Sequence, residues 1–459
     1  MKILLTGATG FVGIHIGRRL IRDGHELVAL SRNPEAASEK LPFPCRVWKW
    51  DSTVSHLPPE VFEGVDAVIH LAGEPVAGHR WTESYKTKIY ESRILGSRHL
   101  VSALGQIHGG RPRILISASA IGYYGNHRDS ELSESSPPGH DFLADVCKGW
   151  EAEVLVPASL SEMRRVCVRI GIVLGLEGGA LPELVEVFRK GLGGPAGSGR
   201  QWMSWIHIED LVEVFVSALQ EDSISGVVNA VAPQPVINLE FSKTLGKILN
   251  RSSQMRTPAL ALKLALGGMS SLILNSQRVI TNVIPPNLFK FPTLEETLTN
   301  LLTSTAALKK NESEFLAEQW VGKPIEEVFH FFSESRNLEI LTPPWLKFKI
   351  IRQSTPTLAK GTVIDYRLKI HGMPVKWKTL IDEWVPGSRF VDVQLKGPYR
   401  RWHHTHHFEK LRQGTLIRDR VIYEIPGGRL GRGVLAGKIR RDLQAIFAFR
   451  RKAMREIFR

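Results

Sequence analysis

The stretch Thr6-Gly7-Ala8-Thr9-Gly10-Phe11-Val12-Gly13 follows directly on the apolar run Ile3-Leu4-Leu5 and precedes a segment, 14–22, of helical character. Glycine in the turn permits a positive φ, and glycine at the start of a helix lets the backbone approach a ligand. The unpaired N–H groups of a helix N-terminus suit a pyrophosphate, and a third glycine allows the helix to pack closely on the strand. The spacing therefore predicts a dinucleotide site whose binding residues are Gly7, Thr9, Gly10, Phe11, Val12 and Gly13.

The composition is that of an ordinary soluble protein of 459 residues, which is too long for one hydrophobic core, so we expect two or three domains. Cys45, Cys147 and Cys167 are few and scattered, which fits a reducing cytoplasm and argues against a disulfide framework or a zinc site. The fingerprint begins so near the first residue that we expect no signal peptide. The most apolar stretch, Ala259–Leu274, is shorter than the ~20 residues that a membrane span needs. We therefore expect a cytoplasmic protein without a membrane span.

The positive charge is concentrated in the last third of the chain. The net charge is +14, and from Lys310 onward 29 Lys and Arg stand against 16 Asp and Glu. A basic domain can bind nucleic acid, anionic lipid or an acidic ligand, but an ordinary solvated surface explains the excess equally well. Because no nucleic-acid-binding module is recognisable, we do not expect a nucleic-acid partner.

The first part of the chain alternates short apolar strands with helical stretches, which predicts an α/β, Rossmann-type doubly wound parallel sheet. The residues of about 240–302 are expected to form the helical end of this domain, which spans 1–302, and the polar segment 303–314 is expected to be a linker. The expected strands are Lys2–Leu5, Glu26–Leu30, Arg46–Trp50, Ala67–His70, Arg113–Ser117 and Arg165–Ile170.

Residues 315–459 show a second pattern, which predicts an α+β domain. A strand leads into a helix that Pro324 starts, six strands follow, and a long helix, about Val434–Phe458, closes the chain. That helix carries an apolar stripe opposite a basic face. Such a helix could lie on a membrane surface, but the strands before it need a cover, so we expect it to lie on a curved antiparallel sheet. The expected strands are Phe315–Val321, Leu346–Arg352, Thr362–Ile370, Val375–Val385, Arg389–Leu395, Trp402–Leu411 and Thr415–Ile425.

The end of the second strand, Ser31-Arg32-Asn33, has no acidic residue where an NAD site usually binds the ribose hydroxyls. Ser31 and Arg32 are therefore predicted to bind the cofactor, with Arg32 pairing with a 2′-phosphate. The cofactor is therefore expected to be NADP, with NAD as the alternative. If Arg32 does not bind a cofactor, it is an ordinary surface arginine. Asp51 is placed to accept from the adenine amino group, and Leu71-Ala72-Gly73 to pass the cofactor at the carboxyl edge of the sheet.

Three motifs in this order resemble the extended short-chain dehydrogenase/reductase family of NAD-dependent epimerases and dehydratases. They are the opening glycine stretch, His70-Leu71-Ala72-Gly73, and Ser117-Ala118-Ser119-Ala120-Ile121-Gly122-Tyr123-Tyr124-Gly125. The resemblance covers about 1–302 and is specific for the family but weak for the substrate. Further stretches are similar to an atypical, sugar-nucleotide epimerase-like branch, namely Glu91-Ser92-Arg93, Cys147-Lys148-Gly149-Trp150-Glu151, Arg169-Ile170-Gly171-Ile172-Val173-Leu174-Gly175, Trp205-Ile206-His207-Ile208-Glu209-Asp210 and Phe291-Pro292-Thr293-Leu294-Glu295-Glu296.

The resemblance implies a catalytic serine and a tyrosine that stands four residues before a lysine. Ser119 matches the serine and Lys148 the lysine, but Ala144 stands where the tyrosine belongs. In the family the tyrosine exchanges a proton with the substrate oxygen, while the lysine lowers the tyrosine's pKa and holds the nicotinamide ribose. Alanine has no proton to give, so Lys148 is expected to keep its cofactor-holding role and to lose the other.

Tyr124 and Tyr123 follow Ser119 on a turn and are the candidate substitute acids. A tyrosine pair packed against the glycine-rich loop explains them equally well. Four other residues were considered for the site. Asp145, next to Ala144, would point off the helix face that carries the lysine. His207 suits a structural or substrate-loop role better than that of a base, and the other two residues are Glu91 and Arg93.

The pattern of 315–459 resembles the START-like (SRPBCC, polyketide cyclase-type) helix-grip fold, most firmly at Gly361-Thr362 and in the spacing of 414–423. The resemblance implies an apolar ligand held between the sheet and the last helix. The run His403-His404-Thr405-His406-His407 puts two histidines on each face of a strand, with only Glu409 nearby. This favours histidines that line a partly polar ligand cavity over a metal site. Three tryptophans would form its apolar wall or belong to the core, Trp377, Trp384 and Trp402.

Two hypotheses of function stay open. The first is an NADP-dependent oxidoreductase or epimerase-type enzyme for a small-molecule, nucleotide-sugar-like substrate, with a C-terminal domain for a hydrophobic ligand; Ser119 and Lys148 support it. The second is a catalytically inactive NADP-binding sensor or scaffold, which Ala144 supports. A homodimer is compatible with both hypotheses.

Overall fold

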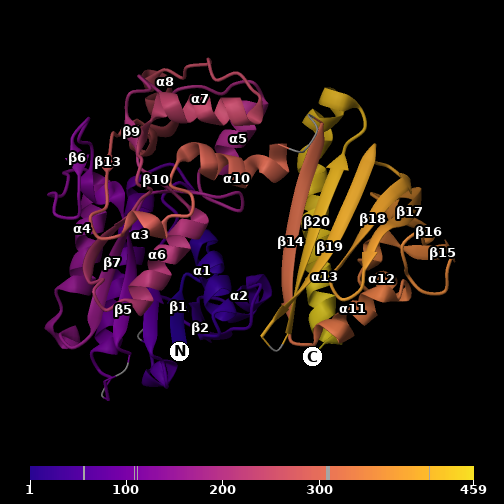
Figure 1. Ribbon diagram of the computed structural model, residues 1–459, viewed down its shortest axis with the longest axis horizontal. Helices are drawn as coiled ribbons and strands as arrows, with labels where there is room; N and C mark the ends of the chain where they lie inside the picture. The colour runs from indigo at the N-terminus through magenta and orange to yellow at the C-terminus, as the bar shows by residue number, and fades with distance from the viewer. Residues whose placement is uncertain (55–56, 108, 111, 307–310, 413, 459) are drawn as a thin grey trace. The chain divides into compact units, whose positions relative to one another are not determined.

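The computed structural model describes residues 1–459 apart from 55–56, 108, 111, 307–310, 413 and 459. The chain divides into two compact units, Met1–Ser38 with Cys45–Ala306, and Glu39–Pro44 with Ala307–Arg459 (Figure 1). The expected linker 303–314 overlaps the end of α10 (Leu294–Ala306) and the start of β14 (Glu312–Val321), and its residues 307–310 lie outside the described ones. Within the described residues, no helix is long and apolar enough to cross a membrane.

The first unit is built on a seven-stranded parallel sheet of order β11-β7-β5-β4-β1-β2-β3. The interior strand β1 pairs Ile3 with Leu27 of β2 on one side and with Ala67 of β4 on the other. The predicted doubly wound sheet is confirmed, and most strand bounds lie within a residue or two of those expected. The strands are β1 (Lys2–Thr6), β2 (Glu26–Ser31), β3 (Arg46–Lys49), β4 (Ala67–His70), β5 (Ile114–Ala120), β7 (Arg164–Ile170) and β11 (Gly226–Ala230).

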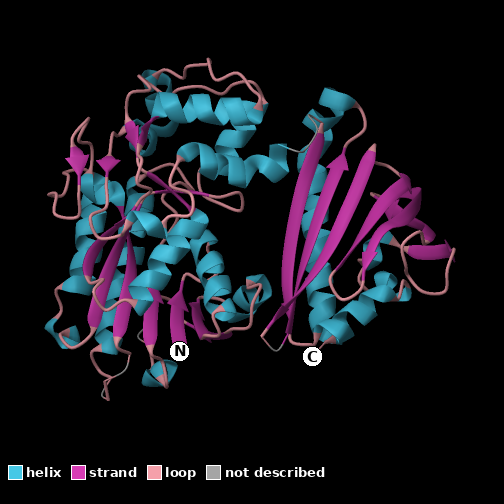
Figure 2. Cartoon of the chain, in the orientation of Figure 1, coloured by secondary structure: helices cyan, strands magenta, loops and turns pink. Residues whose placement is uncertain are grey.

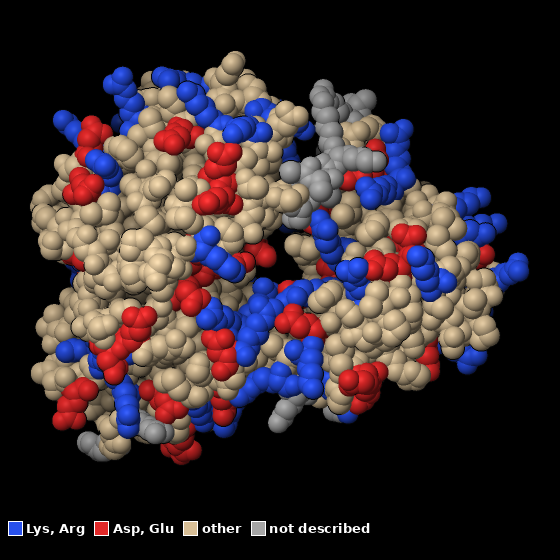
Figure 3. Space-filling view, in the orientation of Figure 1, with Lys and Arg blue, Asp and Glu red and all other residues tan. Residues whose placement is uncertain are grey.

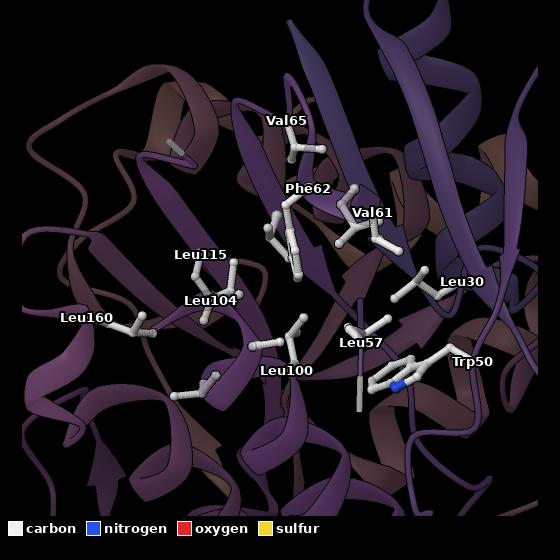
Figure 4. Packing of buried hydrophobic residues seen from close by; sticks show 14 of the residues in the cluster. Leu30, Trp50, Leu57, Val61, Phe62, Val65, Leu100, Leu104, Leu115 and Leu160 are labelled. Atoms are coloured by element: carbon white, nitrogen blue, oxygen red, sulfur yellow. The ribbon is translucent and has the colours of Figure 1, made fainter. Parts of the chain in front are cut away.

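Helices cover both faces of this sheet (Figure 2). Helix α1 (Phe11–Arg22) packs beside α6 (Ile208–Gln220), and α3 (Glu83–Leu104) packs beside α4 (Phe142–Leu155). Because the sheet is covered on both faces, its strands are mostly apolar, as parallel strands usually are. Figure 4 shows part of the core that results, in which these side chains pack together: Leu30, Trp50, Leu57, Val61, Phe62, Val65, Leu100, Leu104, Leu115 and Leu160.

The rest of the first unit consists of short helices and two-stranded ladders. A separate core joins α5 (Leu181–Arg189) and α7 (Asn238–Leu249) to α10. The apolar stretch Ala259–Leu274 is not one continuous helix, because Gly267 has a φ of +60° and ends α8 at Leu266. The remaining elements are α2 (Pro34–Lys40), α8 (Ala259–Leu266), α9 (Ser271–Leu274), β6 (Glu131–Leu132), β8 (Ile172–Leu174), β9 (Trp202–Met203), β10 (Trp205–His207), β12 (Val236–Ile237) and β13 (Arg278–Val279).

The second unit is a seven-stranded antiparallel sheet of order β14-β20-β19-β18-β17-β16-β15 with a long helix, α13 (Gly428–Ile457), against it (Figure 1). This confirms the predicted helix-grip fold. Leu443, Phe447 and Met454 of α13 are buried, so its apolar stripe covers the sheet. The other elements are α11 (Ile325–Ser333), α12 (Arg336–Ile340), β15 (Lys349–Gln353), β16 (Val363–Ile370), β17 (Met373–Val385), β18 (Arg389–Lys396), β19 (Arg401–Leu411) and β20 (Gly414–Glu424).

The basic excess of the second unit is partly neutralised on the sheet. Arg418 of β20 pairs with Glu318 of β14 at 2.9 Å and with Glu409 of β19 at 2.7 Å, and Arg420 pairs with Glu314. Figure 3 likewise shows Asp and Glu among the Lys and Arg side chains on the face in view. A strip of paired charges is typical of a solvated sheet face rather than of an anion-binding patch.

Candidate functional sites

The glycine stretch forms a narrow cradle between β1 and α1. Gly7 has a φ of +69°, and a Cβ there would lie 2.8 Å from the carbonyl carbon of Leu71. A Cβ on Gly13 would lie 2.2 Å from the oxygen of Gly7, so only glycine fits at this crossing of helix and strand. The helix N-cap is Gly10, which offers no side chain to the first amides, and the first turn carries no acid. The N–H groups and the positive end of the helix are thus available to an anion.

A second glycine-rich loop encloses the side chain of Phe11 at the start of α1. Cβ atoms on Gly175 and Gly178 would lie 2.4 Å and 2.6 Å from atoms of the Phe11 side chain. The sequence alone did not connect these glycines with the cradle, because they are more than 160 residues away along the chain. They let the loop lie directly against the residue that the fingerprint places beside the cofactor.

The ends of β2 and β3 place Ser31, Arg32 and Asp51 along the same carboxyl edge of the sheet. The Asn33 amide donates to Ser31 Oγ at 3.2 Å, and Arg32 is exposed. The amide and hydroxyl of Thr53 donate to Asp51 Oδ1 and lower the pKa of Asp51, and the charge of Arg32 lowers it further. The edge thus carries an exposed cation, Arg32, whose charge acts on the carboxylate of Asp51.

At the end of β4 the backbone is fixed by the side chain of Thr6. Its Oγ1 accepts from the amides of Leu71 and Ala72 at 3.1 Å and lies 2.7 Å from His70 Nδ1. His70 is fully buried, and burial lowers its pKa to about 4, so the ring is neutral at pH 7. A Cβ on Gly73 would lie 3.0 Å from the guanidinium carbon of Arg93. This histidine and threonine therefore set the path of 71–73.

The family's tyrosine position lies inside the protein. Ala144 on the first turn of α4 is fully buried, and its amide is capped by Asp141 Oδ1 at 3.0 Å. One helical turn later Lys148 keeps 39% of its side chain exposed and pairs with Asp145 Oδ1 at 2.7 Å. A pair between two exposed side chains contributes little to stability, so the ammonium group can exchange this partner for a ligand.

Ser119 lies within β5, which extends to Ala120 rather than ending at Ser117 as expected. Its Oγ donates to Glu151 Oε1 of α4 at 2.6 Å. Both oxygens of Glu151 pair with Arg169 of β7 at 2.8 Å, and all three side chains are buried. Burial alone would lower the pKa of Arg169, but the hydrogen bonds that it donates to Glu151 raise it, so the guanidinium stays charged.

The same guanidinium holds the two candidate tyrosines. Arg169 donates to the hydroxyl of Tyr124 at 2.9 Å, and that hydroxyl donates to Asn229 Oδ1 at 2.7 Å. Tyr124 is fully buried, which raises its pKa to about 12. The guanidinium carbon lies 3.4 Å from the ring centroid of Tyr123, which is only partly buried. The structure thus places one tyrosine inside a closed polar network and the other at its rim.

Of the other residues considered for this site, His207 and Arg93 make structural contacts. His207 Nδ1 accepts from the Glu209 amide at 3.0 Å and caps α6, and burial lowers its pKa to about 4. Arg93 donates to the carbonyl oxygens of Glu74 and Ile89 and lies over the ring of Trp150. Glu91 is exposed on α3.

The second unit contains a cavity of about 470 Å³ between its sheet and α13. The lining is mostly apolar and includes Trp377 and Trp402, whereas Trp384 packs against Phe329 and Phe390 in the core. His404 and His406 point into this cavity, while the other two histidines of the run alternate with them along β19. The two histidines therefore form a polar stretch of the cavity wall on β19.

Two aspartates flank the cavity histidines, and sequence reasoning found neither as a site residue. Asp392 of β18 stands opposite His404, and Asp419 of β20 stands opposite His406. Arg450 of α13 donates to Asp419 at 3.2 Å. A prediction of these partners would need the register of the neighbouring strands, which a single sequence does not specify.

The comparisons with known families match each unit separately. Residues 3–230 match the NAD dependent epimerase/dehydratase family, 257–301 a domain of unknown function (DUF1731), and 321–448 the family polyketide cyclase / dehydrase and lipid transport. The resemblances drawn from the sequence are thereby confirmed for both units.

Two curated epimerase family proteins are similar to the first unit. The chain is 38% identical over 284 residues to the chloroplastic epimerase family protein SDR39U1 homolog of Arabidopsis thaliana, covering 61% of this chain and 80% of the plant protein. It is 37% identical over 292 residues to epimerase family protein YfhF of Bacillus subtilis, covering 63% and 94%. The first unit of the chain therefore belongs to the NAD-dependent epimerase/dehydratase family.

Solved structures agree with this assignment. Human epimerase family protein SDR39U1, solved with NADPH, superposes with a TM-score of 0.58 at 31% identity, covering 66% of this chain and 99% of the human one. MoeE5, solved with UDP-glucose and NAD, superposes with a TM-score of 0.52 at 21% identity over 66% of this chain and 98% of that one, and so shows the shared fold alone.

Proposed function

We propose that the first unit binds NADP(H) and is an oxidoreductase or epimerase-type enzyme for a small, nucleotide-sugar-like molecule. The observation that carries the proposal is the cradle at the start of α1, where Cβ atoms on Gly7 or Gly13 would strike backbone. An exposed arginine, Arg32, at the end of β2 supports a 2′-phosphate, because a guanidinium pairs with phosphate in a bidentate way. The NADPH of the human relative agrees with this preference.

The residues expected near the nicotinamide have different roles. The nicotinamide ring supplies or accepts the hydride when the cofactor is bound. Lys148 holds the ribose hydroxyls after leaving Asp145, whose pairing at the surface is weak. Ser119 is engaged by Glu151, and Tyr124 is engaged by Arg169 and Asn229. We therefore assign the proton exchange with the substrate oxygen to Tyr123, at the rim of the network, with Ser119 and Tyr124 as positioning residues.

The cofactor proposal is tested by titrating the purified protein with NADPH and NADH and following the nicotinamide fluorescence. NADPH should bind more tightly than NADH. Arg32→Ala should remove most of this preference while leaving NADH binding unchanged, and Gly13→Ala should abolish both. Absence of NADPH binding in the unaltered protein would contradict the proposal.

A second candidate is an NADP-binding sensor or scaffold without catalysis. It is favoured by Ala144, which is fully buried and offers no proton at the family's tyrosine position. UDP-glucose and UDP-glucuronic acid, mixed with the cofactor-loaded protein, serve as probes that distinguish the two. Turnover that Tyr123→Phe removes supports the enzyme. Cofactor binding without turnover, and a cellular function that survives Tyr123→Phe but not Gly13→Ala, supports the sensor.

The second unit is proposed to bind a hydrophobic ligand in its cavity of about 470 Å³. That volume suits a small-molecule site, and apolar walls with a few convergent polar groups are typical of such sites. Native mass spectrometry of the full chain would show a co-purified ligand and, in the same spectrum, whether the protein is a homodimer. A ligand that remains bound after Trp377→Ala and Trp402→Ala would argue against this cavity.

A further inference from the structure

Three metal-binding donor atoms converge at the polar stretch of the cavity wall in the second unit. Asp392 Oδ2 lies 3.3 Å from His404 Nδ1 and 3.2 Å from His406 Nε2. Donor atoms of these three residues all lie within 4.8 Å of one another. The arrangement follows from the sheet, because residues 404 and 406 share one face of β19 and Asp392 is the cross-strand neighbour of His404.

These separations match a coordination shell. Metal–ligand distances of about 2.0–2.2 Å place neighbouring ligand atoms roughly 3–3.5 Å apart around a tetrahedral or octahedral ion. Two of the ligand-to-ligand distances already lie in that range, so small side-chain shifts suffice for all three atoms to touch one ion.

The far sides of both imidazole rings are held by a second carboxylate. Asp419 Oδ1 lies 3.0 Å from His404 Nε2 and 2.7 Å from His406 Nδ1. A carboxylate that accepts the distal N–H of a histidine fixes the ring and its tautomer, and this pattern usually accompanies metal-ligating histidines. Arg450 lies 3.2 Å from the same oxygen and balances its charge, which leaves Asp392 to offset the charge of an ion.

The position of the cluster gives an ion a ligand-accessible side. Asp392, His404 and His406 line the cavity, whereas Asp419 lies behind them and is not part of the lining. Three protein ligands with a remaining open position are typical of metal sites that bind or activate a ligand, as opposed to closed structural sites. Two imidazoles and one carboxylate suit divalent ions of the first transition row.

We propose that Asp392, His404 and His406 bind one such divalent ion, with an open coordination position that faces the apolar cavity. An ion held there would bind a single polar donor atom of a molecule whose body is apolar. The competing explanation is a self-sufficient hydrogen-bonded cluster of two carboxylates, two imidazoles and one guanidinium. The two differ in one measurable property, which is whether the cluster takes up one metal ion per chain.

The experiment uses full-length protein, freed of metal and of any histidine tag, and titrates it with Co²⁺ and then Zn²⁺. Visible absorption bands of Co²⁺ should saturate at one ion per chain, and Zn²⁺ should displace it. Asp392→Asn and His406→Gln should each weaken binding at least 100-fold. Asp419→Asn, which keeps all three ligands, should weaken it roughly 10–100-fold.

The chain offers matched controls on the same strand. His403→Gln and His407→Gln alter histidines on the other face of β19 and should leave the metal affinity within twofold. Circular dichroism and thermal melts of each variant establish that it is folded. No saturable binding by the unaltered protein, or equal losses in control and site variants, would overturn the proposal in favour of the hydrogen-bonded cluster.

Discussion

Ser119 Oγ donates to Glu151 Oε1 at 2.6 Å, in the interior of the first unit. The serine that matches the family's catalytic serine in sequence therefore has a carboxylate partner on α4. That carboxylate also forms a buried ion pair with Arg169, whose guanidinium extends to both tyrosines of the turn after β5. One network thus connects Ser119 with both candidate tyrosines, and its first effect is on stability.

Glu151→Gln should lower the free energy of unfolding by about 3 kcal/mol, because it leaves the guanidinium of Arg169 buried without its counter-charge. Arg169 and Glu151 expose only 3% and 7% of their side chains. Glu153→Gln on the same helix is the control, since its partner Arg98 is 56% exposed and such pairs contribute about 0–1 kcal/mol. Urea unfolding of both variants measures the difference, and equal effects would contradict the buried pair's role.

Tyr124→Phe should destabilise the first unit by roughly 1–3 kcal/mol, because Asn229 and Arg169 each lose a buried hydrogen-bonding partner. Tyr123→Phe should cost less stability, because the ring that stacks on Arg169 is kept. If Tyr123 is the proton donor, its variant should instead lose turnover with cofactor affinity unchanged. Parallel urea unfolding and NADPH titrations separate the two effects; a larger stability loss for Tyr123→Phe would contradict this assignment.

Much of this architecture follows from the sequence, because apolar runs and glycine spacing determine local structure. Every strand of the first sheet except β11 was predicted, as were the strands of the second sheet and the closing helix. Helix α13 begins at Gly428 rather than near Val434. β15 begins at Lys349 rather than at Leu346 as expected, because Leu346 is the last residue of a short 3-10 turn, Pro344–Leu346. The errors in α13 and β15 concern element ends, where local propensity is weakest.

The contacts across the sheets could not be predicted in the same way. The pairing of Asp392 with His404 depends on the register of β18 against β19, and nothing in one strand's sequence specifies its neighbour's register. Glu151 was part of a motif, but its contact with Ser119 joins residues 32 apart through tertiary packing. The sequence thus predicted which residues are present, and only packing brought them together.

The first unit should lose stability as pH falls from about 6.5 to 4. Burial lowers the pKa of both His70 and His207 to about 4. Below pH 6.5 these histidines therefore bind protons in the unfolded chain but stay neutral in the folded chain until the pH approaches 4. The stabilisation is complete above pH 6.5 and falls by roughly 2–3 kcal/mol per histidine on the way to pH 4. His70→Asn should remove part of this slope in urea unfolding at a series of pH values.

Gly178→Ala should weaken NADPH binding without unfolding the protein. The added Cβ would lie 2.6 Å from Phe11, and the relief of this clash moves the phenyl ring and with it the first turn of α1. Because amides of that turn are proposed to bind the pyrophosphate, a displacement there should reduce the affinity for NADPH and NADH alike, by about tenfold for each 1.4 kcal/mol lost. Gly268→Ala is the control, since its Cβ would make an ordinary contact of 3.4 Å with Trp81. Fluorescence titration of the two variants decides the matter: a Gly178→Ala protein that is folded and binds both cofactors as tightly as the control would show that the loop of 175–179 does not support the cofactor site.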